Sequence, residues 1–522
     1  MSGNSTRRQG GKRIRAMRQA PSFAPGPLGT KGGMYRPLSE ADIQRIHSAA
    51  LDVLEQTGFK GATDTVRDLA LGAGCKLDGD GRLLFPRALV EDIIDGAARD
   101  FVLHGQTPSN DIEVRDGHVH FATGGAAVKM LDSASRAYRP STLEDLFDIA
   151  RLVDKLDNIQ WFARPVVATN LEDWRELDLN TVYACARGST KHIGTSITLD
   201  RHVPEIIKML DLMTGRDGGF AQRPFVSVHA TTVVSPLTFA EDSSNVATAA
   251  ARAGMPILSQ TGPLAGATAP AALAGTLVQT VAESLGALVA INLVKKGHPV
   301  ITSGWPFVAD LRTGSFSGGS GEQALLGAGQ AQMMQFYRLP TGVPAGMTDS
   351  KLPDNQAGFE KALTVTLAAM SGPSFVYESV GMLASLLGCS LEAMVIDNEM
   401  IHSIRRSMKG IEVTDASLSI DVIDEASRHV GHYLGNAQTL ALMETEYVYP
   451  SLADRNSPDN WTEQGAQDIT ERARKRVAEV LSAPCPTHIT PENDAAVRAA
   501  FPIRLDPKTA QGLDGRWVKG GN

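Results

Sequence analysis

The feature that most constrains the fold of this chain is a repeat of short β-rich runs that alternate with helical stretches. Successive runs begin roughly 30 to 45 residues apart, which is the length of one strand plus a crossover helix. Eight such units predict an α/β fold of the (β/α)8 TIM-type barrel class. The rival is an open doubly wound sheet, but the sequence has no GxGxxG strand-turn-helix unit. The runs are His118–Gly124, Ile159–Ala168, His192–Leu199, Phe225–Val233, Pro256–Thr261, Pro299–Pro306, Pro340–Gly346 and Ser374–Gly381.

The composition narrows the classes of protein that remain. The 522 residues are 43% hydrophobic and 21% charged, which is ordinary for a globular protein and unlike a disordered or coiled-coil chain. Fifty basic and 58 acidic residues give a net charge of −8, which argues against a nucleic-acid binder. The four cysteines form no CxxC pair, so we expect a reducing compartment and neither a disulfide framework nor a cysteine-rich zinc site.

No stretch of the sequence predicts a targeting or membrane segment. Residues 1–36 contain no apolar run of the kind that a signal peptide needs. The most apolar long segment, 270–294, is interrupted by Gln279, Glu283 and Asn292, and its larger apolar residues recur at helical spacing. We therefore expect a packed helix of a large domain, in a soluble cytoplasmic protein without membrane contact.

The chain divides into four predicted regions. Residues 1–36 carry a run of basic residues before any acidic one and are typical of a disordered basic arm. Residues 37–117 are predicted to form an N-terminal helical cap, whose first helix begins after Ser39. Residues 118–400 hold the catalytic barrel. Residues 401–522 show no clear strand pattern and predict a C-terminal helical extension, with amphipathic helices over 420–445 and 462–481.

The predicted site lies at the carboxyl ends of the strands, where barrel enzymes carry their chemistry. His118 and His120 resemble a metal-binding pair, but both stand at the beginning of their strand. Lys191, Lys295 and Lys296 precede their strands, which is the wrong end for a Schiff base. The sequence has neither a GxSxG elbow nor a Walker A lysine. We therefore expect no metal bound by the chain itself and none of these mechanisms.

Aromatic, amide and carboxyl groups remain at the predicted strand ends, with little acid–base machinery. Aromatic faces attract alkylated ammonium groups by about 0.5–2 kcal/mol for each ring, although most barrel aromatics are core residues. The Gly-rich stretch 314–321 precedes a helix and is typical of a mobile loop over a site. The aromatic candidates are Trp161, Phe162, Trp305, Phe307, Tyr337 and Tyr377.

The segment from Leu339 to Lys361 is the most distinctive in the chain. It contains the runs DSK, DNQAG and EK, and it is accompanied by GHYLG at 431–435, YPSL at 449–452 and ATGG at 122–125. Together these motifs resemble the trimethylamine methyltransferase family, whose members transfer a methyl group from a methylated amine to a corrinoid protein. The resemblance covers residues 38–480 and implies a (β/α)8 barrel. It also implies a corrinoid (cobalamin) on a separate partner protein, because the chain lacks the DxHxxG fingerprint of corrinoid modules.

The chain departs from the family pattern in one respect. The archaeal trimethylamine enzymes of the family carry pyrrolysine on a barrel strand, whereas this chain has only the twenty standard residues. Relatives without pyrrolysine include demethylases of quaternary amines such as glycine betaine. A quaternary ammonium leaves as a neutral tertiary amine, whereas a neutral tertiary amine must first be protonated or captured. We therefore expect a quaternary amine of the glycine betaine type, and protonated trimethylamine stays open as the other substrate.

Roles for individual residues follow as hypotheses. Glu378 and Asp349 are the catalytic candidates, which would balance the positive charge or orient the leaving group. The alternatives are a local turn and ion pair for Asp349 with Lys351, and a structural pair for Glu378 with Arg164. A non-catalytic binder of quaternary amines is the alternative for the whole chain, and a homo-oligomer is expected. The substrate-binding candidates are Trp305, Phe307, Tyr377, His229, Gln260 and Arg164, and the cofactor-binding candidates are Gly346, Met347 and Gly124.

Overall fold

Eight parallel strands lie at the centre of the protein, whose computed structural model describes residues 26–132 and 134–517. One parallel sheet has the order β16-β14-β11-β10-β9, and a second has the order β1-β6-β20-β19, in which β1 (Thr30–Lys31) is antiparallel to β6. Each parallel strand lies within one of the eight predicted runs, so the α/β class is confirmed. The strands are β6 (His118–Phe121), β9 (Trp161–Ala163), β10 (His192–Thr195), β11 (Val226–Ala230), β14 (Ile257–Thr261), β16 (Val300–Gly304), β19 (Gly342–Pro344) and β20 (Phe375–Tyr377).

Hydrogen bonds also connect the two sheets at both pairs of edges. Between β6 and β9, the Gln160 amide donates to the Phe121 carbonyl at 2.9 Å, and residues 122 and 161 form a parallel bridge. Between β16 and β19, the Thr302 amide donates to the Pro340 carbonyl at 2.8 Å. Backbone groups at these edges are therefore satisfied across the sheets rather than left open.

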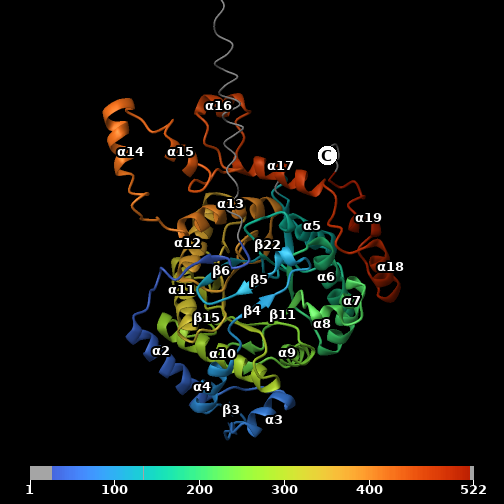
Figure 1. The fold of residues 1–522 in the computed structure, drawn as a ribbon. Coiled ribbons are helices and arrows are strands. Elements are labelled where there is room, and N and C mark those ends of the chain that lie inside the picture. Colours follow the sequence, from blue (N-terminus) through green and yellow to red (C-terminus); the bar gives the residue numbers. More distant parts are fainter. Residues whose placement is uncertain (1–25, 133, 518–522) are drawn as a thin grey trace, which may run out of the picture.

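The connections between consecutive parallel strands contain helices that surround the sheets, as Figure 1 shows. The longest, α10 (Leu273–Val294), is the one helix of the described residues that is long and apolar enough to cross a membrane, but 78% of its apolar window is buried inside the molecule. The predicted packed helix is thus present at this position. The others are α5 (Leu143–Asp154), α6 (Trp174–Gly188), α7 (Val203–Thr214), α8 (Gly219–Gln222), α9 (Glu241–Ala253), α11 (Gly321–Phe336) and α12 (Asn355–Ser371), and α13 (Leu391–Met408) follows β20.

The segment before β6 combines helices with a hairpin. Helices α2 (Glu40–Asp52), α3 (Asp64–Gly72) and α4 (Arg87–Gly96) pack against α10, and Ser39 caps α2 as predicted. The hairpin β4 (Phe101–Leu103) and β5 (Ile112–Val114) is not anticipated by the helical pattern. Its side chains Leu103, Ile112 and Val114 form one buried cluster with interior strand residues such as Trp161 and Phe375. The hairpin therefore packs against side chains that the strands direct inward, and Figure 1 shows it in the middle of the ring of helices.

Small strands extend several of the loops that follow the parallel strands. The predicted mobile loop 314–321 instead contains β18 (Ser315–Ser317), which pairs with β17 (Phe307–Asp310), and the start of α11. β17 also pairs with β15 (Leu264–Ala265). A second such sheet joins β7 (Lys129–Asp132), β8 (Ala137–Pro140), β21 (Met382–Leu383) and β22 (Gly388–Cys389). The remaining short strands are β2 (Lys76–Leu77), β3 (Leu83–Leu84), β12 (Val233–Val234) and β13 (Thr238–Phe239).

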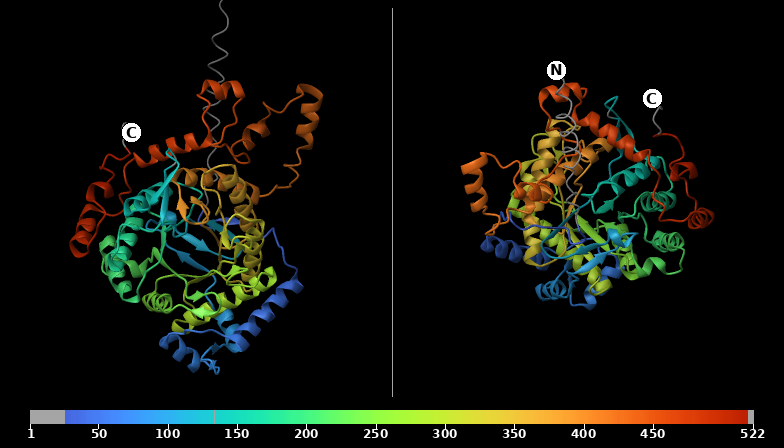
Figure 2. Two further views of the ribbon diagram at one scale, coloured as in Figure 1. Left: turned by 180° about the vertical axis from the view of Figure 1, so that it is seen from behind. Right: turned by 45° about the horizontal axis from the view of Figure 1, so that its top comes forward.

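The C-terminal part is helical, but its helices are shorter than predicted. The amphipathic segment 420–445 consists of α14 (Ile420–Glu425), a π-helical turn and α15 (Ala437–Leu442), since Gly431 with φ 72° ends the first part. The segment 462–481 is interrupted before Asp468, which caps α17. Figure 2 shows these elements above the body. The others are α16 (Pro458–Glu463), α17 (Ile469–Leu481), α18 (Pro491–Ala500) and α19 (Pro507–Ala510).

Two further predictions concern the termini and the cysteines. Residues 1–25 of the predicted basic arm lie outside the described residues. The four cysteines are buried and free, and burial raises the pKa of each thiol. No disulfide therefore contributes to this fold.

Candidate active site

Aromatic side chains from three strands meet between the two sheets, where Tyr377 ends β20 and Trp305 follows β16. The rings of Trp161 on β9 and Tyr377 on β20 are 5.2 Å apart, and that of Trp305, just after β16, is 5.8 Å from Tyr377. Phe307 lies 6.2 Å from Trp305, between centroids. The structure thus brings together the three predicted cage residues Trp305, Phe307 and Tyr377. Phe162 faces the helices instead, as the alternation of side chains along a strand requires.

The polar atoms of these rings have no hydrogen-bond partner within the described residues. The indole nitrogens of Trp161 and Trp305 and the hydroxyl of Tyr377 are all buried and unpartnered. Tyr337, by contrast, lies elsewhere, with its hydroxyl 3.0 Å from His47 Nδ1. A buried donor without a partner costs about 1–3 kcal/mol, so a group of them is typical of a binding site rather than a core.

Glu378 follows Tyr377 directly and is the most perturbed carboxyl group among these residues. Its side chain is 2% exposed, its Oε2 atom has no hydrogen-bond partner in the described structure, and burial raises its pKa to about 8. Its backbone has φ 57°, a left-handed conformation that is strained for a residue with a Cβ atom. Arg164 makes no ion pair with it within 4.0 Å, so the predicted structural pair is not formed. Burial therefore favours the neutral form of the Glu378 carboxyl group.

His229 on β11 lies beside the aromatic residues. Its ring is 5.5 Å from that of Trp161 and 6.0 Å from that of Tyr377, and its Nε2 atom is unpartnered. Burial, with a further contribution from the positive charge of Arg164, lowers its pKa to about 3. Gly194 on the adjacent strand β10 makes room for this arrangement, because a Cβ atom there would overlap the rings of both His229 and Trp161. The imidazole is therefore neutral and free to bond to a ligand.

Arg164 follows β9 and forms no ion pair within 4.0 Å, although the charge of Asp178 on α6 acts on its guanidinium. The closest hydrogen bond of its guanidinium is a long one of 3.5 Å to Ser196 Oγ, and no described carboxylate lies within 4.0 Å. Burial lowers its pKa from the usual value. Gln260 on β14 is also polar, but its amide donates to Thr231 Oγ1 at 2.9 Å. A partly buried arginine that forms no ion pair within 4.0 Å favours an anionic ligand group, because an unpaired buried charge is costly.

Asp349 lies in a different environment from Glu378. Its carboxylate accepts hydrogen bonds from Ser317 Oγ at 3.0 Å, the Gly318 amide at 2.9 Å and Ser385 Oγ at 2.8 Å. Lys351 does not pair with this carboxylate, since its ammonium donates to the carbonyl of residue 349 at 2.7 Å. Asp349 therefore connects the β17–β18 hairpin to the loop after β20 by hydrogen bonds.

Two of the three predicted cofactor contacts, Gly124 and Gly346, lie beside Glu378. A Cβ atom at Gly124 would be 3.2 Å from Glu378 Cγ, and one at Gly346 would be 2.9 Å from the Glu378 carbonyl oxygen. Gly346 has φ 91°, so a side chain there would also strain the backbone. Met347 is buried, and a Cβ atom at Gly318 would be 2.9 Å from its Cβ atom. The glycines therefore allow the loops after β6, β19 and β20 to approach one another.

One buried side chain of this region is not among the predicted residues. Gln330 of α11 is fully buried, and neither its amide nitrogen nor its oxygen has a hydrogen-bond partner in the described part. It faces Gly304, the last residue of β16. Gln323 lies seven residues earlier on the same helix and has the same properties. Two glutamines at this spacing on an otherwise apolar helix face are a signal that the sequence contains.

His118 and His120, at the start of β6, contact backbone carbonyl oxygens. His118 Nδ1 lies 3.1 Å from the Asp116 carbonyl oxygen, and His120 Nε2 lies 3.3 Å from that of Glu113. Within the described ranges, no group of three or more His, Cys, Asp or Glu side chains is placed to hold a metal ion. Both histidines therefore have backbone partners, and burial lowers the pKa of His120 to about 4.

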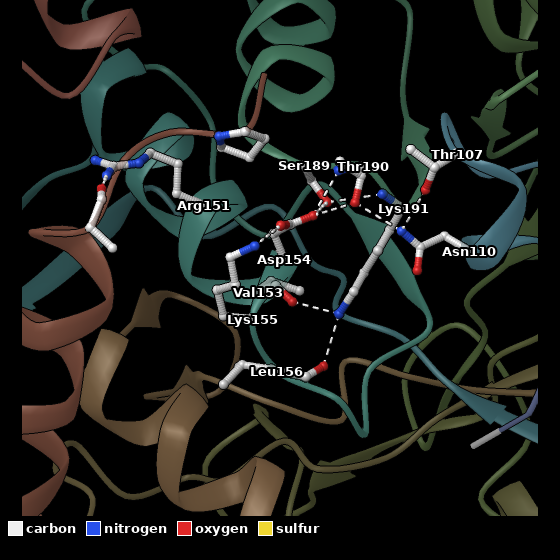
Figure 3. A network of polar contacts seen from close by, with 12 residues as sticks. Thr107, Asn110, Arg151, Val153, Asp154, Lys155, Leu156, Ser189, Thr190 and Lys191 are labelled. Atoms are coloured by element: carbon white, nitrogen blue, oxygen red, sulfur yellow. Dashed lines mark hydrogen bonds and ion pairs between the residues drawn. The ribbon is translucent and has the colours of Figure 1, made fainter. Parts of the chain in front are cut away.

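Lys191 lies just before β10, at the amino end of that strand, as its sequence position predicts. Its ammonium donates to the carbonyl oxygens of Val153, Leu156 and Ile159, at 2.5, 2.8 and 2.6 Å. Burial lowers its pKa to about 8, while the three carbonyl contacts favour the protonated form. Figure 3 shows the side chain reaching the end of α5, beside Asp154. Lys191 thus closes the turn between α5 and β9.

Substituting Lys191 by methionine is expected to lower the thermal unfolding midpoint by several degrees. The change removes three buried hydrogen bonds and leaves their carbonyl groups unsatisfied, at a cost of about 3–5 kcal/mol. Lys155→Met is the matched control, because that side chain is 54% exposed and pairs only with Asp154. Equal shifts for the two variants in a thermal melt would contradict the structural role of Lys191.

Comparisons with known proteins cover most of the chain. Residues 4–506 match the family described as trimethylamine methyltransferase (MTTB). The chain is 32% identical over 485 residues to trimethylamine methyltransferase MttB of Desulfitobacterium hafniense, covering 93% of this chain and 96% of that one. It is 28% identical to a glycine betaine methyltransferase of the same species, over 89% and 96% of the two chains. The crystal structure of Methanosarcina barkeri monomethylamine methyltransferase has a TM-score of 0.46 at 14% identity, over 87% and 96%.

Proposed function

Because the chain belongs to the trimethylamine methyltransferase family and is a methylated-amine methyltransferase, we propose that its substrate is a quaternary amine that also carries a carboxylate, as glycine betaine does. We further propose that the methyl group passes to a corrinoid held by a partner protein. The observation that carries the substrate assignment is the position of Arg164, which forms no ion pair within 4.0 Å and whose charge acts on His229, beside the unpartnered aromatic side chains.

The architecture that we infer for this activity is one closed (β/α)8 barrel within residues 118–400. The hydrogen bonds at both seams between the two sheets support closure, and so does the helix in each connection. Residues 37–117 would then close one end, and residues 401–522 would pack outside. The site residues follow their strands at the other end, where barrel enzymes bind their reactants.

The ammonium group would lie against the rings of Trp305, Tyr377 and Phe307. Each ring contributes about 0.5–2 kcal/mol to the binding of a cation, and the contribution is larger where water is excluded. Tyr377 is fully buried and Trp305 is nearly so, which favours the upper part of that range. The carboxylate of the substrate would accept hydrogen bonds from Arg164, with neutral His229 or Gln260 as a further donor.

Glu378 would face the nitrogen end of the substrate. Its carboxyl group is neutral without a ligand, because burial raises its pKa to about 8, and a bound cation would favour its ionised form. When a methyl group leaves a quaternary nitrogen, the nitrogen keeps the electron pair and becomes a neutral amine, so no proton must be supplied. We assign to Glu378 the stabilisation of the substrate charge, and to Asp349 the positioning of the loops around it.

A corrinoid supplies cobalt(I), a strong nucleophile that accepts the methyl group, when its carrier protein is bound. The residues fit a reactant that approaches from the carboxyl ends, since Glu378 and Tyr377 keep unpartnered atoms there and Gly124 and Gly346 add no side chain beside them. We propose that Gly124, Gly346 and Met347 form the edge of the site that the corrinoid contacts.

A methyl-transfer assay with chemically reduced cob(I)alamin tests this function. Glycine betaine, proline betaine, tetramethylammonium and trimethylamine are offered separately, and the conversion of cobalt(I) to methylcobalt(III) is followed by its absorbance. We expect turnover with the two betaines at rates at least tenfold above those with the amines that lack a carboxylate. Preference for trimethylamine would overturn the substrate assignment. Binding of betaines without transfer, also with the corrinoid protein present, would instead assign the chain as a non-catalytic binder.

A further inference from the structure

An arm, residues 411–447, projects from the body and buries almost none of its own side chains. It contains α14 and α15 and is seen in orange at the edge of the molecule in Figures 1 and 2. Ten of the 26 exposed large apolar side chains of the described residues lie within these 37 residues. Ala426 is the one buried residue among the side chains of the arm that the structure describes. The ten side chains are Ile411, Val413, Leu418, Ile420, Ile423, Tyr433, Leu434, Leu440, Leu442 and Tyr447.

The arm has little that would hold it in this shape alone. α14 and α15 have six residues each, and isolated helices shorter than about 12–15 residues are marginal in water. Its attachment to the body includes ion pairs of Glu446 with Arg406 and Lys409, both at 2.8 Å, near its end. A segment without a core of its own needs an external apolar surface to order it.

We propose that a second copy of this chain covers the arm. The exposed apolar side chains amount to about 1,000 Å², and a stable interface buries about 800 Å² on each partner. Homodimer interfaces are also more apolar than transient ones, as this surface is. Every copy carries the arm, and a second copy is always present in equal number to cover it. A twofold dimer covers the arms of both copies at once.

Charge indicates which part of the second copy the arm meets. The arm has seven acidic residues and one basic residue, a net charge of −6 with neutral histidines, so two arms repel each other. Helix α17 has four basic and two acidic residues, a net charge of +2, and its Arg474, Lys475 and Arg476 are exposed. We therefore place the arm of one copy along α17 of the other, in a reciprocal exchange.

The arm lies away from the proposed reaction site. It follows α13, whose Arg405 bonds to Thr30 of β1 at 3.2 Å and to Asn158, just before β9, at 2.8 Å. Those contacts are at the amino ends of β6 and β9, whereas Glu378 and Trp305 are at the carboxyl ends of their strands. Pairing through the arm therefore leaves the site open, and the inference does not depend on the substrate.

The test is the mass of the full chain in solution, measured by light scattering after size exclusion. The wild type is expected at twice the chain mass, or a multiple of it, at micromolar concentration. The variant I420D/L434D/L440D is expected at the chain mass of 55.6 kDa with an unchanged circular dichroism spectrum. The control L77D/L311D/L513D replaces three exposed apolar residues outside the arm and should keep the wild-type mass. Lys475→Glu with Arg476→Glu should raise the dissociation constant at least tenfold.

Three results would overturn the proposal. A monomeric wild type, or an arm variant that keeps the wild-type mass, would show that the arm does not join two copies. A wild type whose mass rises only when the corrinoid protein is added would assign the arm to that partner instead. An unchanged dissociation constant for the α17 variant would exclude α17 as the surface that the arm meets.

Discussion

The Arg164→Met variant is expected to demethylate glycine betaine with a kcat/KM about 100-fold below that of the wild type. Methionine replaces the apolar stem of the side chain but removes the charge that would meet the substrate carboxylate, and a hydrogen bond to a charged group contributes about 1.5–3 kcal/mol. Tetramethylammonium has no carboxylate, so its slow turnover should be unchanged in the variant. The measurement is the ratio of kcat/KM for the two substrates, in the cob(I)alamin assay.

An exposed arginine provides the control for that experiment. Arg201 lies on the surface after β10, and Arg201→Met should leave both substrates unaffected. An equal loss for betaine and tetramethylammonium in Arg164→Met would indicate a structural role for this residue. Wild-type activity with betaine would remove Arg164 from the site.

The Glu378→Gln variant is expected to be more stable than the wild type at high pH and at least tenfold less active. The folded-state pKa of about 8 lies above the unfolded value of about 4.3, so the folded state keeps a proton that the unfolded state loses. The wild type therefore loses stability, relative to the glutamine variant, as the pH rises from about 4.3 to about 8, and the difference is constant above that. Each pKa unit corresponds to about 1.4 kcal/mol, which makes the expected difference several kcal/mol.

Thermal unfolding of both proteins between pH 5 and 9 measures this difference. Glu172→Gln is the control, because Glu172 is exposed and its replacement should leave the midpoint nearly independent of pH. If the difference in stability between the wild type and Glu378→Gln does not grow toward pH 8, the carboxyl group of Glu378 is not buried in its neutral form. Unchanged turnover would show that Glu378 takes no part in the reaction.

Much of the fold could be predicted because its elements repeat locally. All eight parallel strands lie where β-rich runs alternate with helices, and a residue that ends such a run, such as Trp305 or Glu378, is found at the same end of the sheets. The β4–β5 hairpin could not be found in this way. Its strands have three residues each, and the partners that bury Leu103 and Val114 lie far away in the sequence.

Side-chain direction limited the prediction of the site. Asp349 lies within the most distinctive motif, but its carboxylate is occupied by Ser317 and Ser385, which are 32 and 36 residues away and give no signal near it. Arg164 and Glu378 are adjacent to strand ends of equal appearance, and only the structure shows that neither neutralises the other. The polarity pattern over 420–445 predicts an amphipathic helix, but a sequence pattern cannot show that no neighbouring surface is there for the apolar face to pack on.

The loop of the β4–β5 hairpin bonds to Thr190, just before β10 and thus at the amino end of that strand, which has a consequence for the order of events during turnover. Because Leu103, Ile112 and Val114 pack against the strands there, we expect the amine and the proposed corrinoid carrier to share the entrance at the carboxyl ends of the strands. The amine then has to enter before the carrier seals the entrance, and the demethylated product can depart only after the carrier has withdrawn. We therefore expect ordered binding, with the amine before the carrier. An excess of the carrier should slow turnover, because carrier that binds first blocks the entry of the amine.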